Sequence, residues 1–522
     1  MANRYWVGTA TAWNNILSWA STSGGTPGAS VPGSSDAAFL DANSGSGTVT
    51  LDISPTIQTL TCTGFTGTLA FGTNTISLNS TGTIFTGATT MTVTGTPLII
   101  CTNSSATSRV INPTAVTEAN SISFRITAGT GTMNLSSAVT YRDLDFTDEI
   151  NPTGYAGALA NSSNTIYGNF KASSGMTRTA GTGVYTFAAT SGTKTINTAG
   201  VAFDNPFTFN GVGGTWQLVS ALTSGDTRTA TLINGTLDLN GYTLTTGLFS
   251  SNNGNIRTLA FNTGNITLTG SSTTIWTTGN ATNFSFTGTP TINCTYSGST
   301  GTRTFQLNNT GGTETNVVNI NITAGTDGVT IGSSSKVKNL NLTGWAGALN
   351  SPNTTYYGSL TKSSGMTDVS AGGTSIFAAT SGTNTITSNG VAFACNVTFN
   401  GIGGTWVCAD ALSTGANALT MTNGTLKLAA GTTSTVDSFV TSGTNQKYLL
   451  SSTEGTQATI SDASGTNTVT YLTIQDNIAT GGATWNATSL TNANISNNTG
   501  WLFGVATSGV IYTRRKNKRY FY

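Results

Sequence analysis

The chain has 522 residues, enough for several domains, and its composition is unusually poor in charge. Charged residues make up 7% of it, against about 25% in a typical soluble domain, and the net charge is +1. This balance gives no electrostatic basis for binding nucleic acid or a membrane surface. The sequence contains no histidine, which excludes histidine-dependent triads and histidine general bases.

Residues 1–45 differ in composition from all that follows. They contain Trp6, Trp13 and Trp19, and then a turn-rich stretch with several glycines and two prolines. Three indoles in so short a stretch need a surface to bury against. We interpret 1–45 as an amino-terminal cap or attachment segment, with the three tryptophans as candidate attachment residues. The opening MANRYWVG lacks the apolar segment of a secretory signal, and no later run is as long and apolar as a membrane helix.

From residue 46 to residue 503 the chain alternates apolar and small polar residues in short runs. Examples are Thr56–Leu60, Ser121–Ile126 and Thr236–Leu239, with Gly, Asn, Ser and Thr between the runs. A period of two with many β-branched residues predicts strands, and the intervening residues favour turns. No helical period of ten or more residues is present, so the chain is expected to be all-β.

This body contains internal repeats. The stretch Phe187–Trp216 recurs 190 positions later as Phe377–Trp406, both copies ending in the form FNG-(V/I)-GGTW. Shorter matches extend the repeat in both directions, giving copies near 60–230, 231–420 and 421–500. We favour a parallel β-solenoid with coils of about 20–25 residues, because stacked Thr, Ser and Asn avoid the repulsion of stacked charges. Tandem β-sandwich domains are the alternative.

The carboxyl-terminal part has two distinct features. Trp485 and Trp501 follow the last strand-like runs and suit a cap on the open end of a solenoid core. Residues 504–522 form a basic and aromatic tail, which is a second candidate attachment element. Its basic residues are Arg514, Arg515, Lys516, Lys518 and Arg519.

One acidic cluster is a candidate catalytic site for polysaccharide cleavage, which needs paired carboxylates. It consists of Asp143, Asp145, Asp148 and Glu149. The next copy has Asn339 and Asn341 in place of the first two acids and lacks an insertion, 147–152, that carries the other two. We favour a solvated loop without a catalytic role. No catalytic, cofactor-binding or metal-binding residue is assigned.

Aromatic and sulfur-containing side chains are assigned to the interior. Tyr155, Trp216, Trp345 and Trp406 could stack on sugars, but their repetition favours core packing. The five cysteines show no C-x-x-C spacing and are interpreted as small buried apolar residues.

Two motifs resemble a known family. The segment from Arg4 to Gly8, with Trp13, Trp19 and Phe39-Leu-Asp-Ala-Asn-Ser44, resembles the amino terminus of tailed-bacteriophage and prophage structural proteins. Their opening runs approximately R-Y-W-V-G-G-x-G-x-W and continues to F-D-A-x-S. The stretches Ala479–Trp485 and Asn497–Phe503 resemble the end of the same proteins' Thr/Gly-rich β-domain. Thr9 replaces the family's second glycine, and Leu40 interrupts F-D-A.

The resemblance implies a non-enzymatic virion component, such as a fibre, spike or surface appendage, located in the virion. Its implied partners are further copies of the chain, as a homotrimer, other virion proteins and a host surface glycan. A polysaccharide-depolymerising tailspike and a bacterial surface adhesin are the alternatives. The resemblance implies no cofactor and no catalytic residue.

Overall fold

The computed structural model describes residues 2–8, 10–114, 117–148, 154–271, 273–307 and 314–504. The protein is all-β, with 47% strand and 2% helix, and its parallel coils form a β-solenoid of about 20 turns. The described strand pairs are parallel apart from β1 with β2 in the amino-terminal cap. This confirms the predicted solenoid, and the alternative of tandem sandwiches is wrong because sandwich strands pair antiparallel.

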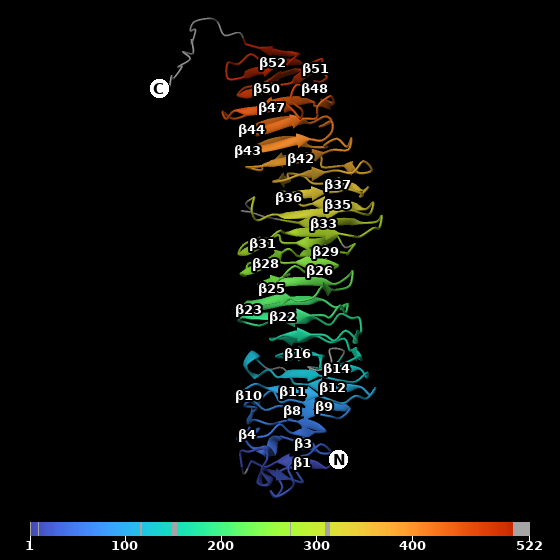
Figure 1. Ribbon diagram of the computed structural model, residues 1–522, viewed down its shortest axis with the longest axis vertical. Helices are drawn as coiled ribbons and strands as arrows, with labels where there is room; N and C mark the ends of the chain where they lie inside the picture. The colour runs from blue at the N-terminus through green and yellow to red at the C-terminus, as the bar shows by residue number, and fades with distance from the viewer. Residues whose placement is uncertain are drawn as a thin grey trace, which may run out of the picture. The chain divides into compact units, whose positions relative to one another are not determined.

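The chain divides into two compact units, residues 1–336 and residues 337–522. Within each unit, successive coils stack their strands one above another (Figure 1). The basic tail, with Arg514, Arg515, Lys516, Lys518 and Arg519, lies outside the described residues.

Unit 1 stacks its strands in several rows. One sheet holds β2 (Trp19–Ala20), β1 (Asn3–Trp6), β3 (Ala37–Phe39), β6 (Thr59–Thr61), β9 (Gly82–Thr86), β12 (Arg109–Asn112), β14 (Met133–Leu135), β17 (Ala158–Leu159) and β20 (Thr177–Arg178). A short sheet holds β4 (Thr48–Thr50), β7 (Thr68–Ala70) and β10 (Thr92–Thr94). A third row holds β5 (Thr56–Ile57), β8 (Ile76–Leu78), β11 (Leu98–Cys101), β13 (Ser123–Ile126), β16 (Leu144–Asp145), β19 (Phe170–Lys171) and β22 (Thr193–Asn197).

Beside that row run β15 (Val139–Tyr141), β18 (Asn164–Ile166) and β21 (Tyr185–Phe187). Both rows continue into β23 (Phe207–Leu218) and β25 (Thr229–Asp238), then into β27 (Leu248–Ser250), β28 (Arg257–Asn262), β30 (Thr274–Thr277), β31 (Phe284–Gly288), β33 (Thr302–Gln306) and β35 (Gly328–Ile331). The last row holds β24 (Leu222–Thr223), β26 (Thr243–Thr246), β29 (Asn265–Leu268), β32 (Thr291–Cys294) and β34 (Val318–Ile322). The described 3-10 turns are η1 (Ile16–Ser18), η2 (Ala42–Ser44) and η3 (Glu118–Asn120).

Unit 2 repeats this plan. One row holds β36 (Lys336–Asn341), β39 (Leu360–Thr361) and β42 (Thr383–Thr387). A second row holds β38 (Thr355–Tyr356) and β41 (Thr374–Phe377). Both rows run into β43 (Asn396–Cys408) and then β44 (Ala418–Leu428). They continue as β46 (Ser438–Thr441), β47 (Lys447–Ser451), β50 (Leu472–Gln475) and β53 (Ala493–Ser496). The other rows hold β37 (Ala348–Asn350), β40 (Thr367–Asp368); β45 (Thr433–Thr435), β48 (Ala458–Asp462), β51 (Asn477–Gly481); and β49 (Thr466–Thr468), β52 (Thr484–Ala487), β54 (Trp501–Phe503).

The period of two fixes which side chains form the core. In β13, Phe124 and Ile126 are buried, while Arg125 between them is half-buried on the outer face. Like residues then stack between coils: in unit 2, the ring centroids of Tyr356 and Phe377 are 5.2 Å apart, and those of Phe377 and Phe399 are 5.1 Å apart. Such stacks add stabilisation beyond the area they bury.

The repeated NG-(V/I)-GG segment makes a tight corner in both units. The register of β23 shifts between Asn210 and Thr215, and that of β43 shifts at the matching residues. A Cβ on Gly211 would lie 1.9 Å from the carbonyl oxygen of Ala189 in the coil below, so only glycine fits there. Asparagine amides link neighbouring coils at this corner, with Asn234 Nδ2 donating to Asn210 Oδ1 over 2.6 Å.

Both ends of the described chain carry tryptophan clusters. Trp6, Trp13 and Trp19 are all buried, and their edge-to-face contacts have centroid distances of 5.3 and 4.8 Å. At the other end the rings of Trp485 and Trp501 pack 5.0 Å apart. The expectation that Trp6, Trp13 and Trp19 need a surface to bury against is confirmed. Strand β3, which lies within residues 1–45, belongs to the stack of parallel strands, because it pairs with both β1 and β6.

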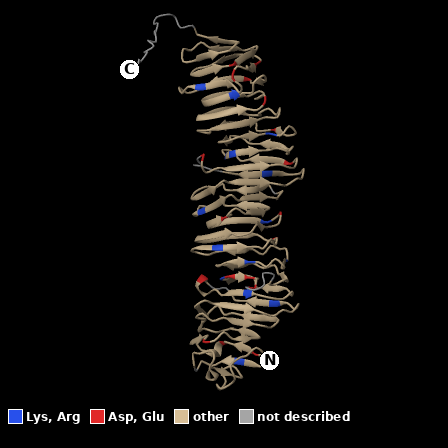
Figure 2. Cartoon of the chain, in the orientation of Figure 1, with Lys and Arg blue, Asp and Glu red and all other residues tan. Residues whose placement is uncertain are grey.

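Few charges are present, as Figure 2 shows, and five cations of the described residues are buried. They are Arg109, Arg257, Arg303, Lys362 and Lys447. Each lies over an aromatic ring, at distances of 3.6 to 5.6 Å from the ring centroid, and donates to backbone carbonyls of the corner loops. Four of these cations, all but Lys447, therefore link corners of neighbouring coils from inside the solenoid, whereas Lys447 donates to carbonyls of its own corner, Gly443 and Asn445.

Candidate binding groove

A groove of about 670 Å³ crosses the outer face of unit 1. It runs from Thr73 and Thr75, which precede β8, over β11, β13, β16, β19 and β22, so a ligand lying in it would cross several coils. Two columns of outward side chains form its floor. The columns stand two residues apart on each strand, on either side of an inward core residue.

The first column is a continuous hydrogen-bonded ladder of Ser123, Asp143, Asn169 and Thr195. Ser123 Oγ donates to Asp143 Oδ2 over 2.6 Å, and the backbone N–H of Asn169 donates to Asp143 Oδ1 over 2.6 Å. Thr195 donates through both its N–H and its hydroxyl to Asn169 Oδ1, over 2.9 and 3.0 Å. Both carboxylate oxygens of Asp143 are therefore engaged in linking coils.

The second column carries alternating charge. Arg125, Asp145 and Lys171 stand in register on β13, β16 and β19, and Asn197 follows on β22. The Nε of Arg125 lies 3.4 Å from Asp145 Oδ2, and both side chains are 23% exposed. Lys171 is exposed. The partly exposed Arg125–Asp145 pair and the exposed Lys171 therefore present charge to a polar ligand in the groove.

The second copy shows that Asp143 and Asp145 have structural roles. Asn339 replaces Asp143 and makes the same link: the N–H of Ser359 donates to Asn339 Oδ1 over 2.6 Å. Asn341 replaces Asp145, and each accepts from the N–H and the hydroxyl of a threonine two residues on. A neutral amide thus supports the same geometry as each acid, which counts against a carboxylate pair selected for acid–base chemistry.

The remaining members of the acidic cluster do not complete such a pair. Asp148 is half-buried and does not line the groove, and Glu149 lies outside the described residues. The charged column is specific to the first copy, because the residues matching Arg125, Asp145 and Lys171 in the second copy are the neutral Asn321, Asn341 and Thr361. The groove therefore combines a repeated neutral ladder with charges that only one copy has.

The other predicted site residues are placed as follows. Trp6, Trp13 and Trp19 are 1% exposed or less, so they cannot contact a partner directly. Ile16 and Leu17 lie on η1, between Trp13 and Trp19 in the sequence, and are 56% and 54% exposed. These two residues were not singled out from the sequence. Their signal was an apolar pair between two tryptophans. The interpretation of the repeated aromatics as core is confirmed: Tyr155, Trp216, Trp345 and Trp406 are all buried.

The cysteines are also buried, as expected. Burial raises the pKa of the Cys62, Cys101, Cys294 and Cys408 thiols to about 12, which makes them poor nucleophiles near neutral pH. Among the described residues, no group of three or more His, Cys, Asp and Glu side chains is placed to hold a metal ion. The same part of the chain contains no helix with the length and apolar character needed to cross a membrane.

Comparison with known proteins finds no match, whether with a protein-family model, a curated protein or a solved structure. The fold class, a parallel β-solenoid, and the geometry of the groove are therefore the basis for a functional proposal.

Proposed function

We propose that this protein is a structural component of a bacteriophage virion, a fibre or surface appendage that binds a host surface polysaccharide through the groove on unit 1. The amino-terminal motif that resembles phage structural proteins supports the first part. In the structure the strand of this motif, β1, belongs to the first stacked sheet of unit 1, and its Trp6 is buried and packs edge to face on Trp19.

The observation that carries the binding proposal is the charged column of Arg125, Asp145 and Lys171 across three coils. A linear polysaccharide laid along the coils presents hydroxyl and carboxylate groups at repeated intervals, as the ladders of the groove do. With Arg142 also lining it, the groove carries three cations and two carboxylates, and both carboxylates already have partners. The surplus positive charge favours an acidic glycan.

The test uses variants that copy the second repeat. Arg125→Asn and Lys171→Thr introduce the residues found at Asn321 and Thr361, so each should fold. We expect the double variant to lose at least tenfold in affinity for polysaccharide extracted from the host surface, measured by calorimetry at low salt. The control Lys427→Thr removes a cation from unit 2 and should bind normally. Equal binding by all three proteins would refute the groove as the site.

The same incubation distinguishes the proposed binding protein from the alternative, a polysaccharide-depolymerising tailspike. A binding protein leaves the polysaccharide intact, whereas a depolymerising tailspike releases new reducing ends. Release of such ends by the wild-type chain would replace the non-enzymatic proposal with the tailspike. The amide replacements at Asn339 and Asn341 favour intact polysaccharide.

For attachment to the particle we propose the exposed pair Ile16 and Leu17 in the cap. An exposed apolar pair beside a rigid tryptophan cluster suits docking to another virion protein. We expect Ile16→Ser with Leu17→Ser to fold normally and to be lost from purified particles. If the variant assembles at the normal copy number, the tail with Arg514, Arg515, Lys516, Lys518 and Arg519 becomes the candidate anchor.

We further propose that the chain is a homotrimer. On unit 1, Val212 and Ile256 are 68% and 79% exposed and flank a groove of about 510 Å³, and the matching Ile402 on unit 2 is 64% exposed. Apolar tips repeated at one corner suit contact between copies of the chain. Light scattering should give three times the chain mass. Val212→Ser with Ile256→Ser should weaken the assembly, and a monomeric wild-type protein would refute the proposal.

A further inference from the structure

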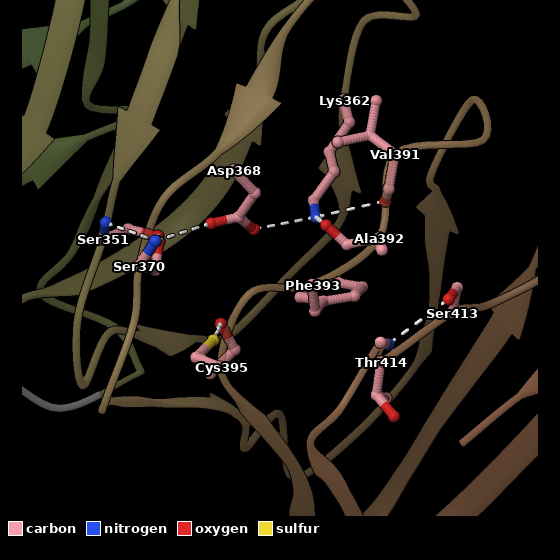
Figure 3. A network of polar contacts seen from close by, with 12 residues as sticks. Ser351, Lys362, Asp368, Ser370, Val391, Ala392, Phe393, Cys395, Ser413 and Thr414 are labelled. Atoms are coloured by element: carbon pink, nitrogen blue, oxygen red, sulfur yellow. Dashed lines mark hydrogen bonds and ion pairs between the residues drawn. The ribbon is translucent and has the colours of Figure 1, made fainter. Parts of the chain in front are cut away.

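A lysine and an aspartate are enclosed together in unit 2. Lys362 follows β39 and Asp368 ends β40, and their side chains are 1% and 3% exposed. The Nζ of Lys362 lies 2.9 Å from Asp368 Oδ2 (Figure 3). Enclosing two charges is unfavourable because each loses its hydration, and their attraction offsets that loss only in a favourable geometry.

The surroundings of the amine fix its orientation. Its other donors reach two backbone carbonyls of the next coil, Val391 O at 3.4 Å and Ala392 O at 3.2 Å. The ring centroid of Phe393 lies 3.6 Å from Nζ. Burial lowers the pKa of Lys362, which favours the neutral amine. Nζ therefore donates to Asp368 Oδ2 and to the two carbonyls, and loss of the proton that it shares with Asp368 would leave its lone pair facing that carboxyl group.

The surroundings of the carboxyl group are asymmetric. The backbone N–H of Ser370 donates to Asp368 Oδ1 over 3.1 Å, while Oδ2 faces the amine. Ser370 is itself fixed, because its hydroxyl oxygen accepts from the N–H of Ser351 over 2.9 Å. A donor fixed on one oxygen stabilises the negative charge that develops there when a nucleophile attacks the carbon. Oδ2 is then the oxygen that can leave.

The first copy provides an internal comparison. At the positions that match Lys362 and Asp368 it has Ala172 and Arg178. Arg178 instead donates to the carbonyls of Leu159 and Ala160 and lies over the ring of Tyr185. This corner of the first copy therefore holds a half-buried cation with no acid beside it at the matching position, whereas the second copy encloses a lysine and an acid together.

We propose that Lys362 and Asp368 form an intramolecular amide bond in the folded protein. The ammonium first transfers a proton to the carboxylate, giving a neutral amine and a carboxylic acid. Nζ then attacks Cγ of Asp368, the Nζ–Cγ bond forms and the Cγ–Oδ2 bond breaks. Oδ2 leaves as water with its own proton and a second proton from Nζ. No oxidant or co-reactant is needed, and both buried charges are removed. The reaction is favoured because the amine and the carboxyl group are held close together in a buried, fixed geometry.

The experiment measures the mass of the full-length protein after denaturation. We expect the wild type to be lighter than its sequence by the mass of one water molecule. Trypsin does not cleave after an amidated lysine, so digestion should yield one peptide, residues 339–427, that lacks one water. A wild-type protein of full sequence mass, cleaved normally after Lys362, would overturn the proposal.

A control variant removes both groups at once, because either one alone would leave an uncompensated buried charge. Lys362→Met with Asp368→Leu should fold and retain the full sequence mass. Water loss that persists in this variant would overturn the proposal. Water loss that maps to Asp327-Gly328, where an Asp–Gly pair can cyclise, would overturn it as well.

Discussion

The buried arginine of β28 allows the role of the interior cations to be measured. Arg257 is 1% exposed, and its guanidinium donates to Ser251 Oγ and to four backbone carbonyls on two coils, those of Ser251, Asn255, Asn280 and Thr282. Arg257→Met retains much of the packing but removes every donor. At about 1 kcal/mol for each carbonyl left without a partner, the variant should lose about 4 kcal/mol.

For a cooperative unit of this size, that loss corresponds to a fall in Tm on the order of 5 °C, measured by thermal melting with circular dichroism. The matched control is Arg142→Met. Arg142 is half-buried, and the bond it donates, to Ala119 O, is 3.4 Å long. That variant should change Tm by about 1 °C or less. Equal melting of the two variants would refute the claim that the buried cations hold the corners.

Two further predictions concern the corners and pH. Gly211→Ala should destabilise unit 1 strongly, because the new Cβ meets Ala189 O at 1.9 Å, whereas Gly47→Ala meets nothing within 4 Å and should melt like the wild type. The backbone N–H of Gly455 lowers the pKa of Asp476, so this carboxylate stabilises the fold above its unfolded pKa of about 4 and loses that contribution as the pH falls further. Melting should therefore be unchanged between pH 8 and pH 6, where no histidine titrates, and fall below about pH 4; Asp476→Asn should reduce the acid-induced part of that fall.

The sequence predicts the fold well because each coil needs the same small set of features. The period of two in runs such as Ser121–Ile126 determines which residues face inward, and the stacking of uncharged side chains favours parallel coils. The repeat of Phe187–Trp216 at Phe377–Trp406 also predicts that the corner geometry recurs, as it does in β23 and β43.

The groove could not be found in the same way. Its charged column depends on the register between coils, and the spacing changes from 20 residues between Ser123 and Asp143 to 26 residues between Asp143 and Asn169. Only the strand pairing brings Arg125, Asp145 and Lys171 together.

The buried cations were missed because a lone Arg or Lys in a strand is normally placed outside. A usable signal was present: Arg257 and Lys447 both follow an Asn-x pair and lie 190 positions apart, so a cation recurs at one position of the repeat.

The central claim, that the chain is a virion component, is tested most directly on infectious particles. Phage particles would be purified by density gradient from a culture that produces the chain, and their proteins identified by mass spectrometry. We expect peptides of this chain to sediment with infectivity in a constant ratio to the major capsid protein. Recovery of the chain only in the cell fraction, with none in the infectious peak, would contradict the account.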